Sequence, residues 1–163
     1  MVENCVNIRL HTQADFKFLS SFFRDPLIIK ENAGGSVLPE EKIAEFCNRS
    51  EENCKQQQCW MFTVLDEKTP VGCCLVRKNA KYGGFEIGFG ILETYRGCGR
   101  ATKAVNLALQ FARNQIQDVG DRVFALVDRQ NNASKRVLAK NGFKHRGEMN
   151  DEQTEIWKVD SAC

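Results

Sequence analysis

A strand, a glycine-rich turn, a long amphipathic helix and a second strand follow one another between residues 85 and 127. Residues 85–92 alternate as in a strand, and residues 122–127 are apolar on both faces, as in a central parallel strand. Between them, apolar residues recur at helical spacing to about residue 117: Ala101, Ala104, Val105, Ala108, Leu109, Ala112 and Ile116. This order predicts two parallel strands joined by a right-handed helical crossover.

Shorter periodic segments predict the remaining elements. Strands are expected at 5–10, 59–65, 71–77, 143–149 and 154–159, and helices at 14–23, 40–53 and 131–140. Asp25-Pro26 ends the first helix, because the residue before proline is pushed out of the helical region, and residues 31–36 are a glycine-containing loop. The sum predicts a mixed α/β fold, with a six- to seven-stranded mixed sheet flanked by about four helices.

Length and charge exclude several classes of protein. The 163 residues suit one domain, and a net charge of +2 is too small for a nucleic-acid partner. No apolar run approaches the ~18 residues of a membrane span, and the first residues lack a secretion signal, so a cytoplasmic protein is expected. The eight cysteines form no Cys-x-x-Cys pair, and neither histidine has ligand spacing to one. Reduced thiols and no metal site are therefore expected.

The turn at residues 96–102 predicts a phosphate or pyrophosphate site. The first amides of a helix lack partners within it, and the helix dipole places positive charge at that end. Gly97 and Gly99 let a ligand approach the backbone, and Arg96, Arg100 and Lys103 add positive charge. The alternative is a solvated tight turn with ordinary surface arginines. A Walker loop is absent, and the turn fails the dinucleotide fingerprint because Thr102 stands at its third glycine.

The strand before this turn has a face with few side chains. Gly88 and Gly90 leave that face bare, which weakens a strand unless something else lies there. Glu86 points to the same face and is a candidate proton acceptor beside a groove. The alternative is an exposed carboxylate or a structural hydrogen-bond partner.

Three motifs in this region resemble one family. Arg96-Gly97-Cys98-Gly99-Arg100-Ala101 resembles the Arg/Gln-x-x-Gly-x-Gly/Ala signature of the GNAT superfamily of acetyl-CoA-dependent N-acetyltransferases. Residues 131–143 resemble its later Asn-x-x-Ser helix, which ends in Gly-Phe. Glu86-Ile87-Gly88 resembles the branch that contains ribosomal-protein serine and alanine N-terminal acetyltransferases. The resemblance implies transfer of an acetyl group from acetyl-CoA to a primary amine, on a protein N-terminus or a small molecule.

The resemblance also implies a cofactor site. Its members are Phe89, Gly90 and Ile91 for the pantetheine arm, Arg96, Gly97, Cys98, Gly99, Arg100, Ala101 and Thr102 for the pyrophosphate, Asn131 for the arm, and Ser134 near the thioester sulfur. The family's parallel strands splay beyond the signature and leave a cleft where thioester and amine meet. Lys135 and Arg136 either approach the nucleotide's phosphate or form a solvated helix face.

Two positions depart from the family pattern. Leu138 stands where many members have a tyrosine that protonates the departing thiolate, and the carboxylate base of some relatives falls at Gly84. Ser134 is therefore the candidate acid and Glu86 the candidate base for direct attack by the amine in a ternary complex. A covalent route through Cys98 is the less favoured alternative, because no histidine is placed to activate that thiol.

The same departures support an alternative from another class, a catalytically silent acyl-CoA-binding or sensing domain. In either case residues 1–163 are expected to form one domain, with an acceptor-side half (1–80), an acetyl-CoA-binding core (85–143) and a C-terminal hairpin (143–160). The acceptor site is expected near residues 16–23 and 32–36, with the acidic residues Glu40, Glu41 and Glu45 as attractors of a cationic amine. The resemblance also makes a homodimer possible, since the family often dimerises, but the sequence itself does not define the oligomeric state.

Overall fold

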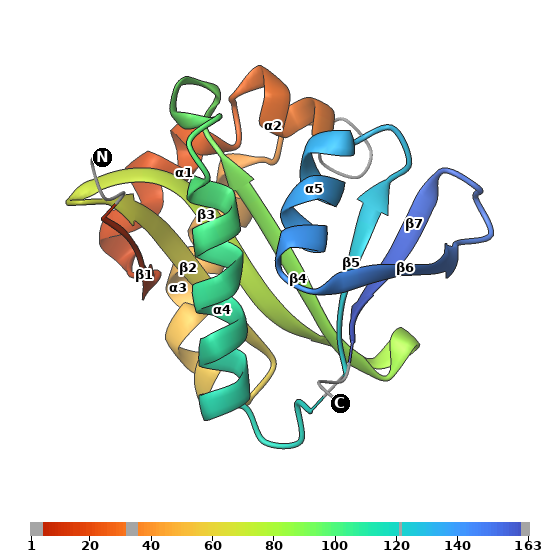
Figure 1. The fold of residues 1–163 in the computed structure, drawn as a ribbon. Coiled ribbons are helices and arrows are strands. Elements are labelled where there is room, and N and C mark those ends of the chain that lie inside the picture. The colour runs from red at the N-terminus through yellow and green to blue at the C-terminus, as the bar shows by residue number, and fades with distance from the viewer. Residues whose placement is uncertain (1–4, 32–35, 121, 161–163) are drawn as a thin grey trace.

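A seven-stranded sheet in the order β1-β2-β3-β4-β5-β7-β6 forms the centre of the molecule (Figure 1). The computed structural model describes residues 5–31, 36–120 and 122–160. The strands are β1 (Val6–Leu10), β2 (Cys59–Asp66), β3 (Thr69–Asn79), β4 (Gly84–Ile91), β5 (Val123–Asp128), β6 (Phe143–Glu148) and β7 (Thr154–Val159). All neighbouring pairs are antiparallel except β4 and β5. The prediction of a mixed α/β fold with six or seven strands is confirmed.

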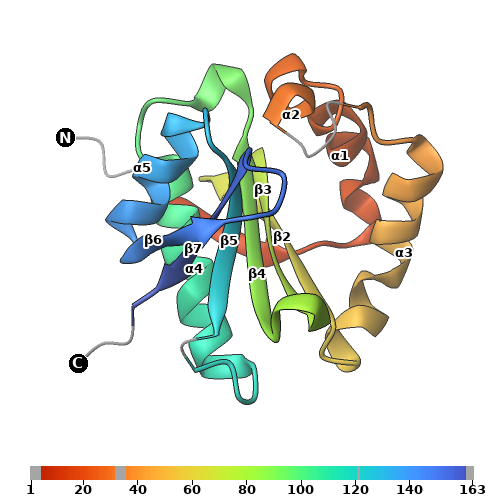
Figure 2. The ribbon, with the colours of Figure 1, turned by 90° about the vertical axis from the view of Figure 1, so that its right-hand side faces the viewer.

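Helices cover both faces of this sheet. They are α1 (Phe16–Phe22), α2 (Pro26–Glu31), α3 (Glu40–Lys55), α4 (Arg100–Gln115) and α5 (Asn132–Lys140), with short 3-10 turns η1 (Gln13–Asp15), η2 (Ala80–Tyr82) and η3 (Glu93–Tyr95). In Figure 2, α1, α2 and α3 lie on one side of the sheet and α4 and α5 lie on the other. Helices α4 and α5 therefore cover the face of the sheet opposite to α1, α2 and α3.

The long helix α4 packs its apolar stripe onto the sheet. Ala104, Val105, Ala108, Leu109 and Ala112 are each at most 2% exposed, which confirms the helical periodicity. Together with buried residues of β2 to β5 they form the larger of two apolar clusters. Burying a Val or Leu side chain contributes roughly 1.5–3 kcal/mol, so this face holds the start of α4 rigidly beside β4.

The sequence analysis assigns no helix to residues 26–31, which form α2, and Glu31, expected in a loop, is the last residue of that helix. Asp25 accepts hydrogen bonds at its carboxylate from the amides of Leu27 (3.0 Å) and Ile28 (3.2 Å), and it therefore caps the helix. Pro26 takes the first helical position, where its missing N–H costs nothing. Asp-Pro ends one helix here and begins the next. Residues 32–35 of the expected loop lie outside the described residues.

The parallel strands β4 and β5 diverge soon after they begin. Only Phe85 with Val123 and Glu86 with Phe124 are paired in register. Beyond Glu86, β4 runs on to Ile91 and β5 to Asp128 without pairing to each other. The expected splayed parallel pair is confirmed, and it leaves an opening in the sheet.

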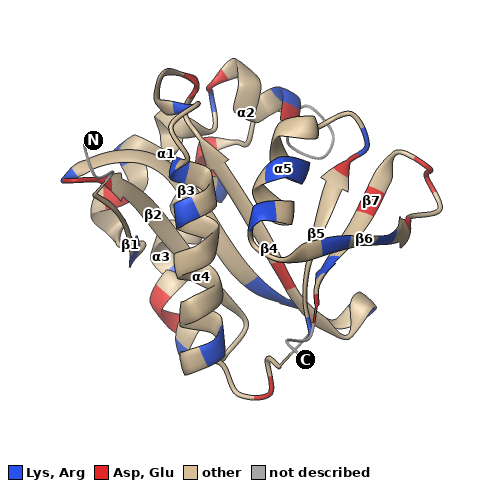
Figure 3. Cartoon of the chain, in the orientation of Figure 1, with Lys and Arg blue, Asp and Glu red and all other residues tan. Residues whose placement is uncertain are grey.

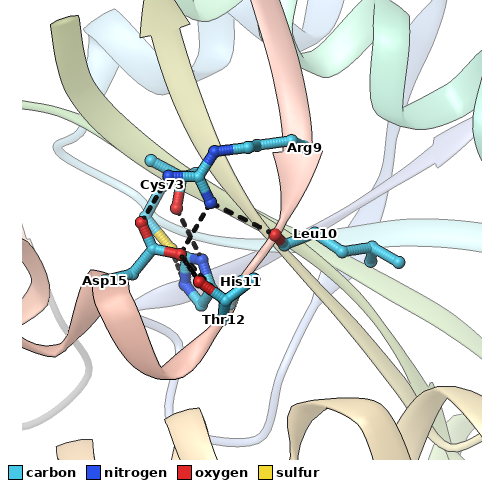
Figure 4. A network of polar contacts seen from close by, with 7 residues as sticks. Arg9, Leu10, His11, Thr12, Asp15 and Cys73 are labelled. Carbon is cyan, nitrogen blue, oxygen red and sulfur yellow. Dashed lines mark hydrogen bonds and ion pairs between the residues drawn. The ribbon is translucent and has the colours of Figure 1, made fainter.

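A partly buried polar network joins the end of β1 to the start of α1 (Figure 4). His11 is 2.8 Å from the Thr63 hydroxyl through Nδ1 and 3.6 Å from the Cys73 sulfur through Nε2. Beside it, Arg9 donates two hydrogen bonds of 2.7 Å to Asp15. Burial lowers the pKa of His11 to about 4. Burial opposes ionisation of Asp15 as well, but the hydrogen bonds from Arg9 and the Thr12 amide lower its pKa to about 2.

Candidate functional site

The glycine-rich turn between η3 and α4 exposes backbone amides. Gly97 and Gly99 have φ values of +90° and +76°, in the left-handed region that favours glycine. A Cβ added to either would meet no protein atom within 4 Å, so the space beside both is open. Gly99 is the N-cap of α4, and no side chain caps the helix there. The first amides of α4 are therefore available to an anion, as the sequence predicts.

A pocket of about 310 Å³ opens beside this turn, between α4, α5 and the end of β4. It brings together ten residues predicted for the cofactor site: Phe89, Gly90, Ile91, Arg96, Gly97, Gly99, Arg100, Ala101, Thr102 and Ser134. Cys98 and Asn131 are not among its lining residues. Six further residues line the pocket. The sequence analysis leaves the role of Arg136 open and does not assign the other five to the site: Glu31, Tyr95, Ala133, Val137 and Lys140.

The two arginines of the turn are held by protein groups. Arg96 donates to both carboxylate oxygens of Glu31 (2.8 and 2.9 Å). Arg100 donates to Asp66 (2.7 Å) and to the Tyr95 carbonyl (3.0 Å). Each guanidinium therefore has a carboxylate partner that is remote in sequence, which the expected positive charge of this turn does not take into account.

Among the described residues, two cations of α5 that face this pocket have no carboxylate within ion-pair distance. Arg136 and Lys140 line the pocket, four residues apart on one helical face with Ala133 and Val137. Lys135 points elsewhere, since its ammonium contacts Glu155 at 3.1 Å and the Arg129 carbonyl. Figure 3 shows Lys and Arg on both α4 and α5. The helical spacing of residues 133, 136, 137 and 140 was the available sequence signal.

A second cavity, of about 770 Å³, lies in the splay between β4 and β5. Its walls include residues 86–90 of β4 and 125–128 of β5, the ends of α1 and α2, and the β6–β7 loop. Four residues line both cavities: Glu31, Phe89, Gly90 and Ser134. The two cavities therefore meet at the end of β4 opposite the start of α5.

The glycine face of β4 is partly covered by other side chains of the protein. A Cβ at Gly90 would lie 3.0 Å from Ile28 Cδ1 and 3.0 Å from Phe22 Cζ, and one at Gly88 would touch Leu75. These glycines therefore make room for side chains of α1, α2 and β3, and both also line the second cavity. Gly90 still lines both cavities.

Glu86 lines the second cavity and is clamped there. Arg77, directly opposite on β3, donates from Nε (3.0 Å) and Nη2 (2.9 and 3.1 Å) to its two oxygens. Asn79 Nδ2 adds a bond of 2.9 Å. The Glu86 side chain is 13% exposed, so the carboxylate is oriented and shielded but still reachable from the cavity.

The start of α5 places Ser134 at the junction. Asn131 is the N-cap, and its side-chain oxygen accepts the Ser134 amide at 3.0 Å. Asn131 itself lines the second cavity rather than the first. Leu138 is fully buried in the core, so it offers no acid at the position where many relatives have tyrosine. Cys98 is exposed and contributes to raising the pKa of Arg100, after the larger contribution of Asp66.

Only some of the residues expected to form the acceptor site line the second cavity. Phe22 and Phe23 line the second cavity, as expected for the first helix. The glutamates of α3 do not line either cavity: Glu40, Glu41 and Glu45. Glu45 pairs with Lys42 and Arg49 on the surface of α3, and Glu40 pairs with Arg24, which follows α1. The β6–β7 hairpin supplies walls that were not expected, including Asp151 and Thr154.

Comparison with known families settles the class. The model of the acetyltransferase (GNAT) domain matches residues 6–144. The chain belongs to the GNAT acetyltransferase family. As a member it is an acetyl-CoA-dependent acyltransferase, which confirms the enzyme class expected from the three motifs. No curated protein sequence matches the chain.

Solved structures share the GNAT fold at low sequence identity. A ribosomal-protein alanine acetyltransferase from Vibrio fischeri is 20% identical, with a TM-score of 0.79 over 97% of this chain and 93% of that one. RimL, a ribosomal-protein alpha-N-acetyltransferase in complex with coenzyme A, is 14% identical, with a TM-score of 0.79 over 99% and 98%. An aminoglycoside acetyltransferase with coenzyme A and kanamycin is 16% identical, with a TM-score of 0.78 over 96% and 94%. At these identities the likeness establishes the fold alone.

Two further properties hold for the described part of the GNAT domain. No helix among these residues combines the length and apolarity that crossing a membrane requires. No group of three or more His, Cys, Asp or Glu side chains among them is arranged to hold a metal ion.

Proposed function

We propose that this GNAT enzyme transfers an acetyl group from acetyl-CoA to a primary amine by direct attack in a ternary complex. The observation that carries the proposal is the junction of the two cavities at Phe89, Gly90 and Ser134. A thioester entering from the cofactor pocket and an amine entering from the larger cavity would meet there. Holding two reactants in line in this way accounts for much of an enzyme's rate acceleration.

The residues present fit acetyl-CoA. The open space beside Gly97 and Gly99 and the first amides of α4 suit a pyrophosphate, and Arg136 and Lys140 add positive charge to the same pocket. The edge of β4 from Phe89 to Ile91 has no strand partner on the β5 side, so its backbone can pair with the amides of a pantetheine arm, although the Ile91 carbonyl already accepts from Arg96 Nε. When bound, acetyl-CoA supplies the activated acetyl group.

The chain's own residues then handle protons and charge. Glu86, held by Arg77 and Asn79, takes a proton from the acceptor ammonium directly or through a water molecule. Amides on the β4 edge donate to the carbonyl oxygen as negative charge develops on it. The hydroxyl of Ser134 donates to the departing sulfur. These roles follow from the position of each group on the cavity walls.

The larger cavity suits an amine with both a cationic and an apolar part, such as a protein N-terminus or a small amine. Asp128 and Asp151 line it, and among the described residues no cation lies within ion-pair distance of either. Hydrogen bonds from the amides of Thr154 and Gln153 lower the pKa of Asp151, which favours its charged form. Phe22, Ile28 and other apolar side chains form the opposite wall.

A thiol-release assay tests the proposal. The protein is incubated with acetyl-CoA and a panel of amines and peptide N-termini, and coenzyme A binding is measured in parallel by calorimetry. Thiol release that depends on both acetyl-CoA and an amine is expected. Tight coenzyme A binding without thiol release from any amine would instead favour a catalytically silent acyl-CoA-binding or sensing domain.

A further inference from the structure

Helix α2 is anchored at both ends on the segment that joins β4 to α4. At its start, the Asp25 carboxylate accepts the Glu93 amide at 3.4 Å. At its last described residue, Glu31 receives two hydrogen bonds from Arg96. Between these ends, the packing of Ile28 against Gly90 presses the helix onto β4. A six-residue helix with few contacts of its own is thus fastened to the strand and turn beside the cofactor pocket.

Arg96 is the connector at the C-terminal end of α2. Its Nε donates to the Ile91 carbonyl at 2.7 Å, and its two terminal nitrogens bind the two oxygens of Glu31. All three guanidinium nitrogens are therefore in use, in the fork geometry in which arginine binds a carboxylate strongly. Both side chains are less than a third exposed, at 27% and 29%. Arg96 immediately precedes Gly97, the first residue of the turn with a left-handed backbone.

Glu31 also occupies a special place between the cavities. It lines the cofactor pocket together with Arg96. It also lines the second cavity, the acceptor cavity of the proposed function, together with Phe22, Ile28 and Lys30. The same ion pair thus fixes one wall of each cavity. If it opens, α2 loses its C-terminal anchor and the phosphate-binding turn loses a constraint next to Gly97.

We propose that Glu31 is a positioning residue that couples the two sites. Through Arg96, it links the turn that binds coenzyme A to helix α2. The turn conformation that binds coenzyme A is then also the one that holds α2 over the acceptor cavity. The inference rests on the proposed function. Linkage is reciprocal, so coenzyme A binding tightens α2, and loosening α2 weakens coenzyme A binding. Glu31 need not touch the reacting atoms to have this effect.

Hydrogen–deuterium exchange of the α2 amides, with and without coenzyme A, tests the coupling in the wild-type protein and in Glu31→Gln. In the wild type, coenzyme A is expected to slow exchange at residues 27–31. In Glu31→Gln this slowing is lost, and coenzyme A affinity measured by calorimetry falls about fivefold, at the low end of allosteric couplings because the ion pair is partly exposed. Glu31→Asp, which keeps the charge, is expected to restore part of the slowing.

Glu41→Gln is the matched control, since Glu41 is an acidic residue of α3 that lines neither cavity. Because exchange is compared between the bound and free states of each variant, a merely structural loss of stability cancels. Equal slowing in the wild type and Glu31→Gln overturns the coupling while the proposed function stands. No binding of coenzyme A to the wild type overturns the proposed function and the coupling with it.

Discussion

Arg77 and Glu86 lie directly opposite each other on β3 and β4, and the guanidinium binds both carboxylate oxygens at 2.9 to 3.1 Å. This pair stands at the last register position at which β4 is still paired with β5. The carboxylate is therefore fixed at the bottom of the opening between the strands. Its orientation depends on Arg77 and Asn79, and its reach into the cavity depends on the splay.

Glu86→Gln tests the proposed proton acceptor. The amide keeps the size of the side chain but cannot take a proton, so kcat is expected to fall on the order of a hundredfold. The remaining rate should rise with pH as more of the acceptor amine is already neutral. Steady-state kinetics from pH 6 to 9 give both quantities. Glu148→Gln on β6 is the control, and unchanged turnover of Glu86→Gln across this range removes Glu86 from the role.

Ser134→Ala tests the proposed donor to the departing sulfur. A hydrogen bond to a group that gains charge is worth more in the transition state than in the bound ground state, so kcat is expected to fall about tenfold. Coenzyme A affinity should change by less than about twofold. Asn132→Ala controls for disturbance of α5, because Asn132 is the first residue of this helix and lines neither cavity. Equal kcat values for Ser134→Ala and the wild type would rule out this contribution.

Gly99→Ala and Gly142→Ala separate ligand binding from backbone strain. Both glycines have positive φ values, +76° and +81°, and open space at the Cβ position. Each substitution is expected to cost about 1–2 kcal/mol of unfolding free energy. Only Gly99→Ala places a methyl group in the proposed phosphate site, so it alone should weaken coenzyme A binding. Denaturant unfolding and calorimetry measure the two effects. Similar coenzyme A affinities for both variants contradict the assignment of the turn.

Arg136→Ala and Lys135→Ala compare neighbouring cations on α5. Arg136 lines the cofactor pocket, so its loss should weaken coenzyme A binding several-fold, and less so at high salt because charge interactions are screened. Lys135 pairs with the buried Glu155, so its loss should leave affinity unchanged and lower the unfolding free energy by about 1 kcal/mol. The coenzyme A affinity of both variants is measured at two salt concentrations. Weaker binding by Lys135→Ala but not by Arg136→Ala would show that the wrong face of α5 has been assigned to the cofactor pocket.

His11 should make the fold sensitive to acid. Its pKa is lowered from 6.5 to about 4 by burial, so between these values the unfolded chain binds the proton and the folded protein does not. Stability is therefore highest above pH 6.5 and falls as the pH drops, by about 2 kcal/mol between pH 7 and pH 5. Asp15, with a pKa of about 2 against 3.8, adds its loss only below that window.

His11→Asn keeps a polar group near Thr63 and removes the titration. It should be less stable than the wild type at pH 7 but show a smaller loss between pH 7 and pH 5. Denaturant unfolding at the two pH values measures this difference. An identical pH dependence in both proteins contradicts the assignment to His11.

The amino-acid sequence alone determined the strand, turn, helix and strand from residue 85 to residue 128, and with them the fold class. Alternation in β4, the stripe of α4 and the glycines of the turn are properties of neighbouring residues, so their backbone conformations follow from local sterics and periodicity. The turn with positive φ values at Gly97 and Gly99 could be predicted for the same reason. Asp25-Pro26 carried a local signal for α2 that is equally consistent with the end of a helix.

Tertiary structure decided what surrounds these elements. Glu31 and Arg96 are 65 positions apart, and Asp66 and Arg100 are 34 apart, so no local pattern shows that the arginines of the turn are already paired. The bare face at Gly90 is occupied by Ile28 and Phe22, which reach it only after α1 and α2 fold over β4. Charge pairing and the filling of space depend on which distant side chains meet. Sequence periodicity shows on which face of its helix or strand a residue lies, but it does not show which distant side chains contact that face.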